Sequence, residues 1–561
     1  MRTVSIGNQD FESIRKNNNF YIDKTGFIKE WWDSNDIVTL ITRPRRFGKT
    51  LNMSMLNCFF SNKYSSREDL FEGLDIWNNE KYRKIQGTYP VIFISFAAVK
   101  ETNIEDAKYR ICNLLVDLYE NNSYLLKSDL LSENEKEQFK SIKVGMNPIA
   151  APDSIKILCG YMEKYFGKKV LIFLDEYDTP MQEAYVSGYW SEMASFMRTF
   201  FNSTFKTNPY LDRAVMTGIT RISKESMFSD LNNLNVVTTT NNEYATCFGF
   251  TEHEVFDALE EAELSEKKED VKCWYDGFIF GNHSDIYNPW SITNFINQRK
   301  FKTYWVDTSS NAMASKLIQR GSPEIKKSME KLLDGKSIKV DIDEQIVFEQ
   351  LDKDENAIWS LLIASGYLKV NNADTCEEDE KYELSFTNLE VSKMFQKLIK
   401  EWFRTTRTTS DEFVKALITG DIKAMNHYMN KIALATFSYF DVGNKPSEYV
   451  EPERFYHGFV LGLMVGEKEN YIIKSNRESG FGRYDIMMVP KDIKNADFPA
   501  IVIEFKVYDE EDEDSLKDTV AAAHKQIEEK RYDEEIIQFG IEKNRIRHYG
   551  FAFEGKKVLI G

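Results

Sequence analysis

The sequence lacks the cysteine and histidine spacing that marks a structural zinc site or a disulfide framework. Its 561 residues include six cysteines and six histidines, and no two cysteines form a C-x-x-C pair. The histidines are likewise scattered, without the spacing of metal ligands. These absences argue against zinc and against disulfides, and they predict a protein of the reducing cytoplasm.

Long apolar runs and an excess of positive charge are also missing. No run of about 18 apolar residues occurs, and the first residues, Met-Arg-Thr-Val-Ser-Ile-Gly, lack the apolar core of a signal peptide. We therefore expect a soluble intracellular protein with no membrane partner. The 72 Lys and Arg residues are outnumbered by 89 Asp and Glu residues, which gives a net charge of −17. Such a chain repels nucleic acid on average, so any nucleic-acid contact needs a local patch or a bound metal.

Apolar and aromatic residues are plentiful. They make up 42% and 14% of the chain, which is enough to build large cores. At about 150 residues per domain, the length predicts roughly three to four domains. We find no internal repeat in the sequence.

Residues 38–50, Val-Thr-Leu-Ile-Thr-Arg-Pro-Arg-Arg-Phe-Gly-Lys-Thr, contain a pattern typical of a phosphate-binding loop. An apolar β-branched run predicts a buried strand, and a Gly-Lys-Thr sequence then leads into a helical pattern. The N–H groups and the dipole of a helix N-terminus attract an anion. We expect Gly48 to allow close backbone approach, Lys49 to reach the β- and γ-phosphates, and Thr50 to hold Mg²⁺. Arg43 stands where the full pattern has its first glycine, so an ordinary strand–turn–helix with a glycine N-cap is the alternative.

Two carboxylates follow another apolar run further along the chain. Lys-Val-Leu-Ile-Phe-Leu, residues 169–174, predicts a central parallel strand that ends in Asp175 and Glu176. Ligands of open α/β sheets bind at the carboxyl ends of the strands. We expect Asp175 to hold the magnesium shell and Glu176 to orient and deprotonate an attacking water. Solvated acids after a strand are the alternative, but the order after the Gly-Lys-Thr sequence favours a nucleotide site.

A third apolar strand begins at Arg213 and carries polar residues at its tip. Thr217 is placed there to sense a γ-phosphate. Arg221, just past the tip, is placed to stabilise charge on the phosphates. A surface salt bridge is the alternative role for Arg221.

These segments together resemble the bacterial AAA-ATPase-like family. The matching segments are Thr42 to Thr50, Phe173 to Asp178, Thr217 to Arg221, Tyr21 to Thr25, Trp274 to Gly277 and Tyr287 to Ser291. The loop of that family also reads Arg-Pro-Arg-Arg-Phe-Gly-Lys-Thr, so Arg43 is family usage. The resemblance covers residues 4–310 and implies a P-loop domain that binds ATP, followed by a helical lid. It also implies that Arg46 and Phe47 belong to the nucleotide-binding loop.

The middle of the chain carries two further patterns. Residues 251–345 read as mostly helical, with Trp274 and Tyr275 expected in a lid core rather than in a base-stacking platform. Residues 357–402 follow the order helix, turn, strand, wing, strand, helix, which is the outline of a winged-helix module. The stretch 371–381 is acidic, which suits a structural or protein-contact role better than binding to DNA phosphates. This connector is therefore the expected contact for a protein partner or for a homo-oligomer.

Charged residues interrupt two apolar runs near the C-terminus. Asp485 lies in one predicted strand, while Glu504 and Lys506 lie in the next and share one of its faces. Burial of such charges costs several kcal/mol unless they are paired or bind a metal. One interpretation is a Glu504–Lys506 pair at a sheet edge. In the other, Asp485 and Glu504 are ligands of Mg²⁺ or Mn²⁺, and Lys506 lies beside an attacking water.

The pattern Asp, loop, Glu-x-Lys resembles the PD-(D/E)XK nuclease fold over about residues 450–561. The following helix carries Gln526 and Tyr532, and Glu453 fits the acidic residue that this fold often has before the first strand. The resemblance implies a metal-dependent nuclease that acts on DNA. The acidic run 509–514 would repel DNA unless it is a solvated loop that points away.

The sequence thus predicts an α/β protein: a P-loop NTPase parallel sheet with a helical lid and a winged-helix-like connector, then a C-terminal α/β restriction-endonuclease-like domain. The expected domains are 1–250, 251–345, 346–449 and 450–561. ATP binding or hydrolysis is expected to gate Mg²⁺-dependent cleavage of a phosphodiester, with DNA as the expected substrate. One alternative is a regulatory switch or scaffold whose C-terminal domain binds DNA or a partner without cleaving. Another is an ATPase that acts only on protein partners.

Overall fold

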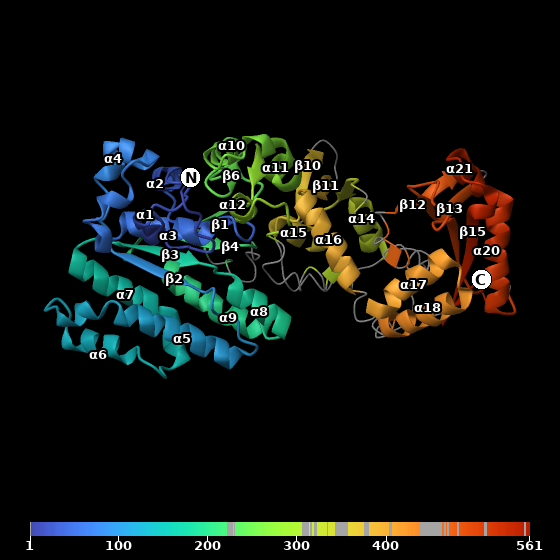
Figure 1. Cartoon of the computed structure of the whole chain (residues 1–561). Coiled ribbons are helices and arrows are strands. Elements are labelled where there is room, and N and C mark those ends of the chain that lie inside the picture. Colours follow the sequence, from blue (N-terminus) through green and yellow to red (C-terminus); the bar gives the residue numbers. More distant parts are fainter. Residues whose placement is uncertain are drawn as a thin grey trace. The chain divides into compact units, whose positions relative to one another are not determined.

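The computed structural model describes most of the chain (Figure 1). The described residues are 2–220, 228, 231–305, 314, 317–318, 323–333, 335–342, 357–374, 381–402, 407–437, 460, 463–464, 467, 470–479, 482–509, 513–554 and 557–561. The chain divides into two compact units, one of Met1–Arg320 with Gly335–Ser392 and one of Gly321–Asp334 with Lys393–Gly561. Among the described residues, every helix falls short of the length and apolar character that a transmembrane span requires.

A parallel sheet of five strands forms the centre of the first unit, in the order β2-β3-β4-β1-β5. Its strands are β1 Val38–Thr42, β2 Val91–Ser95, β3 Val170–Asp175, β4 Leu211–Gly218 and β5 Leu234–Val237. Strands β1 and β3 are buried along their whole length, because helices cover both faces of a parallel sheet. The register pairs Ser95 with Asp175 and Ile41 with Thr217, so these strand ends lie at one edge of the sheet.

Helices pack on both faces of this sheet, with α1 to α3 on one face and α5, α7 and α9 on the other (Figure 1). The helices are α1 Phe11–Lys16, α2 Gly26–Ser34, α3 Lys49–Phe60, α4 Glu80–Arg83, α5 Ile104–Glu120, α6 Glu133–Ser141, α7 Ala151–Phe166, α8 Thr179–Ser187 and α9 Trp190–Phe201. Alternate strand residues feed the two cores: Ile41 and Phe173 pack with α3, and Leu40 and Leu174 pack with α7. The predicted α/β fold with a parallel sheet is confirmed.

Residues 250–305, called the lid segment below, combine helices with a small antiparallel sheet in the order β6-β8-β7. The elements are β6 Phe250–Thr251, α10 Glu252–Glu261, α11 Lys268–Tyr275, β7 Phe278–Phe280, β8 His283–Tyr287 and α12 Pro289–Gln298. The prediction of a mostly helical region is therefore incomplete. The chain turns between β7 and β8 at Gly281-Asn282, where Gly281 has a φ of 54°. A Gly-Asn pair between short apolar runs is a hairpin signal that the helical interpretation passed over.

A second antiparallel sheet, in the order β10-β11-β9, takes β10 and β11 from the predicted connector and β9 from the end of the region predicted as the lid. The elements are β9 Ile338–Val340, α15 Ala357–Ala364, β10 Leu368–Asp374, β11 Lys381–Phe386 and α16 Leu389–Trp402. Helix, strand, strand and helix follow one another in the predicted order over residues 357–402. Most of the acidic stretch between the two strands, residues 375–380, lies outside the described residues.

A mixed sheet of five strands forms the second unit, in the order β12-β13-β14-β15-β16. Its strands are β12 Tyr471–Ser479, β13 Gly482–Pro490, β14 Ala500–Val507, β15 Ile546–Glu554 and β16 Lys557–Ile560. The helices are α14 Pro323–Leu333, α17 Arg407–Thr419, α18 Ile422–Phe437, α20 Leu516–Lys530 and α21 Asp533–Gln538. Strands β14 and β15 are parallel, with α20 in the crossover between them, and the other pairs are antiparallel.

The two faces of this sheet belong to two cores. Ile503 and Phe551 pack with α17 and α18 on one face, whereas Val502 packs with α20 and α21 on the other. The sequence placed α17 and α18 in the connector, residues 346–449, but their apolar side chains cover the C-terminal sheet. The predicted C-terminal α/β fold is confirmed, and its packing begins before residue 450.

Candidate functional site

The loop between β1 and α3, residues 43–48, is called the phosphate loop below. Gly48 precedes α3 with a φ of 79°, and Arg46 has a φ of 66°. A Cβ atom at Gly48 would meet no other atom within 4 Å, so the left-handed backbone and not crowding favours glycine. The first N–H groups of α3 have no partner within the helix and open toward this loop. The loop is therefore shaped to receive an anion.

Lys49 lies inside the phosphate loop. Its side chain is buried, and its Nζ donates to the backbone carbonyls of Arg43 at 2.9 Å and Pro44 at 2.8 Å. Burial lowers the pKa of Lys49 to about 8, while the carboxylates of Glu176 and Asp178 act in the opposite direction. The two carbonyls use two of the three donors of an ammonium group. The third N–H of the Lys49 ammonium can therefore bond a phosphate.

Asp175 lies at the end of β3 with no exposed surface. Its Oδ1 accepts from the Thr217 hydroxyl at 2.6 Å, and its Oδ2 accepts from the Thr50 hydroxyl at 2.8 Å. Burial raises the pKa of Asp175, and the two hydroxyl donors oppose this shift. The Thr50 and Asp175 oxygens form a donor set that suits Mg²⁺ next to nucleotide phosphates. Thr217, which the sequence predicted as a γ-phosphate sensor, is fully buried, and its hydroxyl is used on Asp175.

Glu176 follows directly and adopts a left-handed backbone with a φ of 52°. Its Oε2 accepts from the Thr179 hydroxyl at 3.0 Å. Non-glycine residues in this region carry strain that is often found at functional sites. The half-buried Glu176 side chain is thus held at the strand tip, beside Asp175.

A network that the sequence analysis missed holds the loop after β4. Asp178 Oδ2 accepts from the backbone N–H groups of Ile219 at 3.0 Å and Thr220 at 2.9 Å. Gln182 donates to the same oxygen at 2.8 Å and accepts from Arg45 at 3.2 Å, so the network reaches the phosphate loop. The Asp-Glu-Tyr-Asp sequence contained Asp178 but gave no sign of these distant partners. Arg221, the predicted charge stabiliser, lies outside the described residues.

Two phosphate-loop side chains, those of Arg43 and Phe47, point into the packing around the loop. Arg43 is fully buried, donates to the carbonyls of Thr42 at 2.9 Å and Thr238 at 2.7 Å, and lies 4.9 Å from the ring of Phe280. The position of the first glycine is therefore occupied by an arginine, whose side chain links the loop to Thr238 and Phe280. Phe47 is also fully buried, with its ring 4.7 Å from that of Phe278, so its backbone is the part left for a ligand.

A cavity of about 380 Å³ lies beside the phosphate loop. It is lined by residues 4–9, 20–22 and 45–52, by Glu176 and by Trp290. Ligand pockets usually have volumes of roughly 300–1,000 Å³. The guanidinium of Arg46 stacks on Trp290 of α12 at 4.3 Å, at the lid side of this cavity. The cavity has the size and the polar groups that a nucleotide needs.

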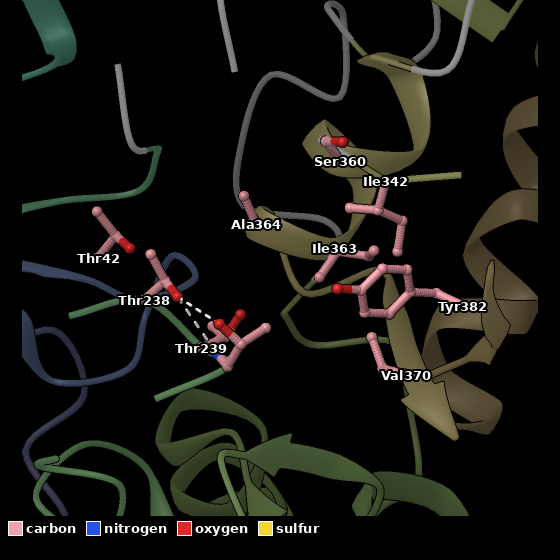
Figure 2. Close-up of a pocket in the computed structure, with 10 residues that line it drawn as sticks. Thr42, Thr238, Thr239, Ile342, Ser360, Ile363, Ala364, Val370 and Tyr382 are labelled. Atoms are coloured by element: carbon pink, nitrogen blue, oxygen red, sulfur yellow. Dashed lines mark hydrogen bonds between the residues drawn. The ribbon is translucent and has the colours of Figure 1, made fainter. Parts of the chain in front are cut away.

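A second cavity, of about 40 Å³, has room for water molecules but not for a nucleotide. It lies between strand residues such as Thr42 and Thr238 and connector residues such as Ser360 and Tyr382 (Figure 2). Its lining contains hydroxyl and apolar groups. None of the described residues that line it carries a charge for a phosphate.

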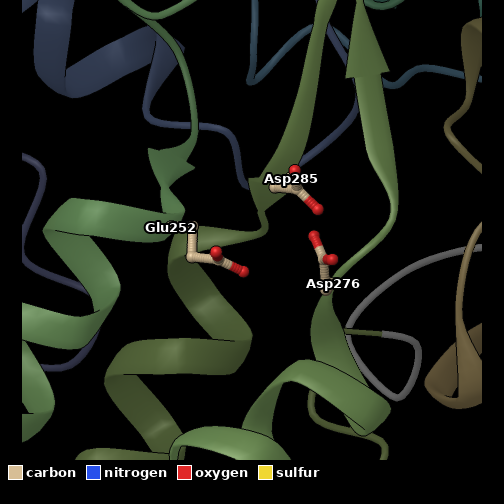
Figure 3. A group of neighbouring side chains, drawn as sticks. All are labelled: Glu252, Asp276 and Asp285. Carbon is tan, nitrogen blue, oxygen red and sulfur yellow. The ribbon is translucent and has the colours of Figure 1, made fainter.

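Three carboxylates meet in the lid segment: Glu252, Asp276 and Asp285 (Figure 3). The ammonium of Lys272 bonds Glu252 and lies 3.6 Å from Asp285. Burial, together with the neighbouring Asp285, raises the pKa of Asp276 to about 7. The ammonium of Lys272 and the raised pKa of Asp276 therefore both reduce the negative charge of this group. No sequence pattern predicted this group.

The predicted C-terminal residues also come together. Ile486 pairs with Ile503 in the antiparallel register, so Asp485 and Glu504 lie on the same face of neighbouring strands. Asp485 Oδ2 accepts from the backbone N–H of Phe505 at 2.8 Å. Lys506 shares the Glu504 face of β14 and is half-buried.

Glu504 is held from the neighbouring helix. Its side chain is 3% exposed, and Gln526 of α20 donates to its Oε1. The same Gln526 amide reaches the Tyr532 hydroxyl at 3.3 Å. Burial raises the pKa of Tyr532 to about 12, and the charges of Glu504 and Asp485 add to this shift. Two carboxylates on one face provide the oxygen donors that Mg²⁺ or Mn²⁺ prefers. The predicted Glu453 lies outside the described residues.

The described ends of the acidic run lie close to α20. Glu513 Oε2 accepts from the Thr519 hydroxyl at 2.5 Å and from the backbone N–H of Asp509 at 3.3 Å. A carboxylate before a helix is stabilised by the helix dipole. Part of the run thus lies against the start of α20, while residues 510–512 lie outside the described residues.

Comparisons with known proteins match the N-terminal and the C-terminal parts of the chain to two different families. Residues 5–228 match a family model described as a predicted AAA-ATPase, and residues 451–561 match the PD-(D/E)XK nuclease superfamily. A curated protein of Azotobacter chroococcum mcd 1, described as an uncharacterized protein in the vnfD 5′ region, is 24% identical over 396 residues. That match covers 70% of this chain and 68% of the relative. The relative's description names no activity.

Proposed function

Because the chain joins an AAA-ATPase-like domain to a domain of the PD-(D/E)XK nuclease superfamily, we propose that it hydrolyses ATP and cleaves DNA. In this proposal the nucleotide state of the first domain gates cleavage by the second. Each activity has its own residues, so each can be tested by itself.

The ATPase half is supported best by the hydrogen-bonded chain from Thr50 through Asp175 to Thr217, beside the buried Lys49. The α3 N-terminus and Lys49 bind the phosphates. Thr50 and Asp175 hold Mg²⁺, which supplies positive charge next to the phosphate oxygens. Glu176 accepts the proton of the attacking water and keeps its orientation through Thr179.

The nuclease half is supported best by the buried Glu504, which Gln526 holds on the face it shares with Asp485. Asp485 and Glu504 are the proposed ligands of Mg²⁺ or Mn²⁺, and such an ion stabilises negative charge on a phosphodiester. Lys506 lies on the same face and orients the water or stabilises the developing charge.

A regulatory protein that binds DNA or a protein partner without cleaving it is the second candidate. The net charge of −17 and the acidic residues near α20 favour it, because both repel the DNA backbone.

We also propose a cytoplasmic location. The described cysteines, 58, 112, 159, 247 and 273, are free thiols, as a reducing compartment allows. A partner or a second copy of the chain at the connector is part of the same proposal.

The test of the nuclease is cleavage of plasmid and single-stranded DNA by the full chain with Mg²⁺ or Mn²⁺. Lys506→Ala should lower cleavage about 100-fold or more, whereas Lys525→Ala, an exposed lysine on α20, should leave it unchanged. ATP hydrolysis measured on the same samples should be equal in all three proteins. Absence of cleavage by the wild type, with ATP hydrolysis intact, would favour the regulatory candidate.

A further inference from the structure

The backbone of the phosphate loop is held from outside by the lid segment. Trp305 donates from its indole Nε1 to the carbonyl oxygen of Arg45 at 3.0 Å, and Asn288 donates to the same oxygen at 3.4 Å. A peptide unit is rigid and planar, so a fixed carbonyl also fixes the N–H of the next residue. That residue is Arg46, whose backbone is left-handed and lines the large cavity. Trp305 therefore sets the direction of an N–H group in the phosphate loop.

Trp305 is held in turn by a carboxylate that neither proposed activity uses. Glu390 Oε1 accepts from the backbone N–H of Trp305 at 2.7 Å, and its Oε2 accepts from the Ser291 hydroxyl at 2.7 Å. Glu390 has no exposed surface. Burial of a carboxylate is costly, and an apolar residue would fill this place on α16 with less penalty. The charge is therefore better explained by what it positions than by packing.

Ser291 and Trp305, which donate to Glu390, belong to segments that touch the phosphate loop. Ser291 lies in the first turn of α12, where the helix dipole favours a nearby carboxylate. Its neighbour Trp290 stacks on Arg46, and Trp305 bonds Arg45. Glu390 thus accepts hydrogen bonds from both segments that contact the loop, through Ser291 on α12 and through Trp305.

Glu390 also lies in the first turn of α16, whose later residues, from Lys393, belong to the second unit. The start of α16 is anchored by Asn388, which donates to the Tyr275 carbonyl at 3.1 Å and accepts from the Val391 N–H at 3.0 Å. The residue that supports the loop therefore lies on a helix whose residues are divided between the two units.

We propose that Glu390 is a positioning residue for nucleotide binding, which acts through Trp305 and α12 on the backbone of Arg45 and Arg46. The inference rests on the proposed binding of ATP at the phosphate loop. Removal of either contact loosens the loop and weakens ATP binding. Because coupling between two sites is reciprocal, bound ATP in turn steadies the start of α16.

The decisive variants are Trp305→Phe, which removes the indole N–H and keeps a ring, and Glu390→Gln, which removes the charge. Affinity for a slowly hydrolysed ATP analogue is measured by titration calorimetry on the full chain. A hydrogen bond of about 1 kcal/mol corresponds to roughly a fivefold weaker affinity for each variant. The double variant should bind no more weakly than the weaker single variant, because both act through one path. Trp77→Phe, a tryptophan packed on Phe71 away from the cavity, is the matched control and should bind like the wild type.

The outcomes separate this inference from the proposed function. If the wild type binds no ATP analogue, the proposed function fails. If the wild type binds and both variants bind with wild-type affinity, the positioning role is wrong. A purely structural role would lower the thermal midpoint of the nucleotide-free variants and leave the affinity unchanged, which also overturns the proposal.

Discussion

The two candidate sites draw their residues from different lengths of chain. In both sites, however, neutral groups donate hydrogen bonds to the carboxylates. The first gathers residues from the phosphate loop, α3, β3, β4 and the lid segment, whereas the second uses two adjacent strands and one helix. Asp175 accepts from two hydroxyls, Asp485 accepts from a backbone N–H, and Glu504 accepts from a side-chain amide. A neutral donor fixes a carboxylate without cancelling its charge, and the hydroxyls of Thr50 and Thr217 hold Asp175 in this way.

The C-terminal site should show the largest effect if this comparison holds. Glu504→Gln should lower DNA cleavage by about 10²- to 10³-fold, because the amide keeps the shape but loses the charge. The same change should raise the thermal midpoint, since a buried charge is removed. Cleavage rates and midpoints on one preparation check both effects. A lower midpoint would show that the charge of Glu504 is compensated within the fold.

The N-terminal site should respond in the same direction. Asp175→Asn should lower ATP hydrolysis about 100-fold and raise the midpoint of the nucleotide-free protein. DNA cleavage without ATP should stay at the wild-type rate, which serves as the internal control. A loss of both activities would indicate that the variant is misfolded or that the sites are not separate.

A smaller effect should follow when a residue that donates a hydrogen bond to one of these carboxylates is replaced. Thr217→Val removes the 2.6 Å hydrogen bond to Asp175 and should weaken the affinity for Mg-ATP about tenfold. Thr39→Val is the matched control, because the buried Thr39 Oγ1 has no hydrogen-bond partner among the described residues. Equal affinities for the two variants would mean that Thr217 does not position Asp175.

The smallest effect is expected at the lid carboxylates Glu252, Asp276 and Asp285. They contrast with the two sites because a charged group, the ammonium of Lys272, bonds one of them. The pKa of Asp276 is raised to about 7, so the folded state holds a proton that the unfolded state releases near pH 4. The free energy of unfolding should therefore fall as the pH rises from about 4 to 7. Lys272 and Asp285 face this group and oppose each other in their effect on it.

Asp276→Asn should remove that dependence. The variant should exceed the wild type in thermal midpoint at pH 8, and the difference should shrink as the pH falls and vanish below about pH 4, measured by circular dichroism. Asp117→Asn, an exposed aspartate on α5, should show no such difference. The same midpoint difference at both pH values would contradict a raised pKa at Asp276.

Much of the fold could be predicted because buried parallel strands are continuous apolar runs in the sequence. β1 and β3 are buried on both faces and appear as apolar runs. Thr50 follows β1 at the start of α3, and Asp175 ends β3, which is the order a nucleotide site needs. The C-terminal sheet was predictable from two charges on one face of an apolar strand. The Gly281-Asn282 hairpin carried a signal too, but it lies within a helical pattern.

Side-chain directions could not be predicted in the same way. Phe47 turns its ring toward Phe278, and Thr217 turns its hydroxyl toward Asp175, because distant segments pack there. Asp178 and Glu390 were missed for a related reason. Their partners lie far along the chain, and no local spacing marks them.

Gating of cleavage by ATP is the central claim, and one rate comparison tests it. Initial rates of plasmid cleavage with Mg²⁺ would be measured with and without ATP for the wild type and for Lys49→Ala. We expect ATP to change the wild-type rate at least about fivefold, and to leave the rate of Lys49→Ala unchanged at the level of the ATP-free wild type. The same ATP response in both proteins, or none in the wild type, would contradict the coupling of the two domains.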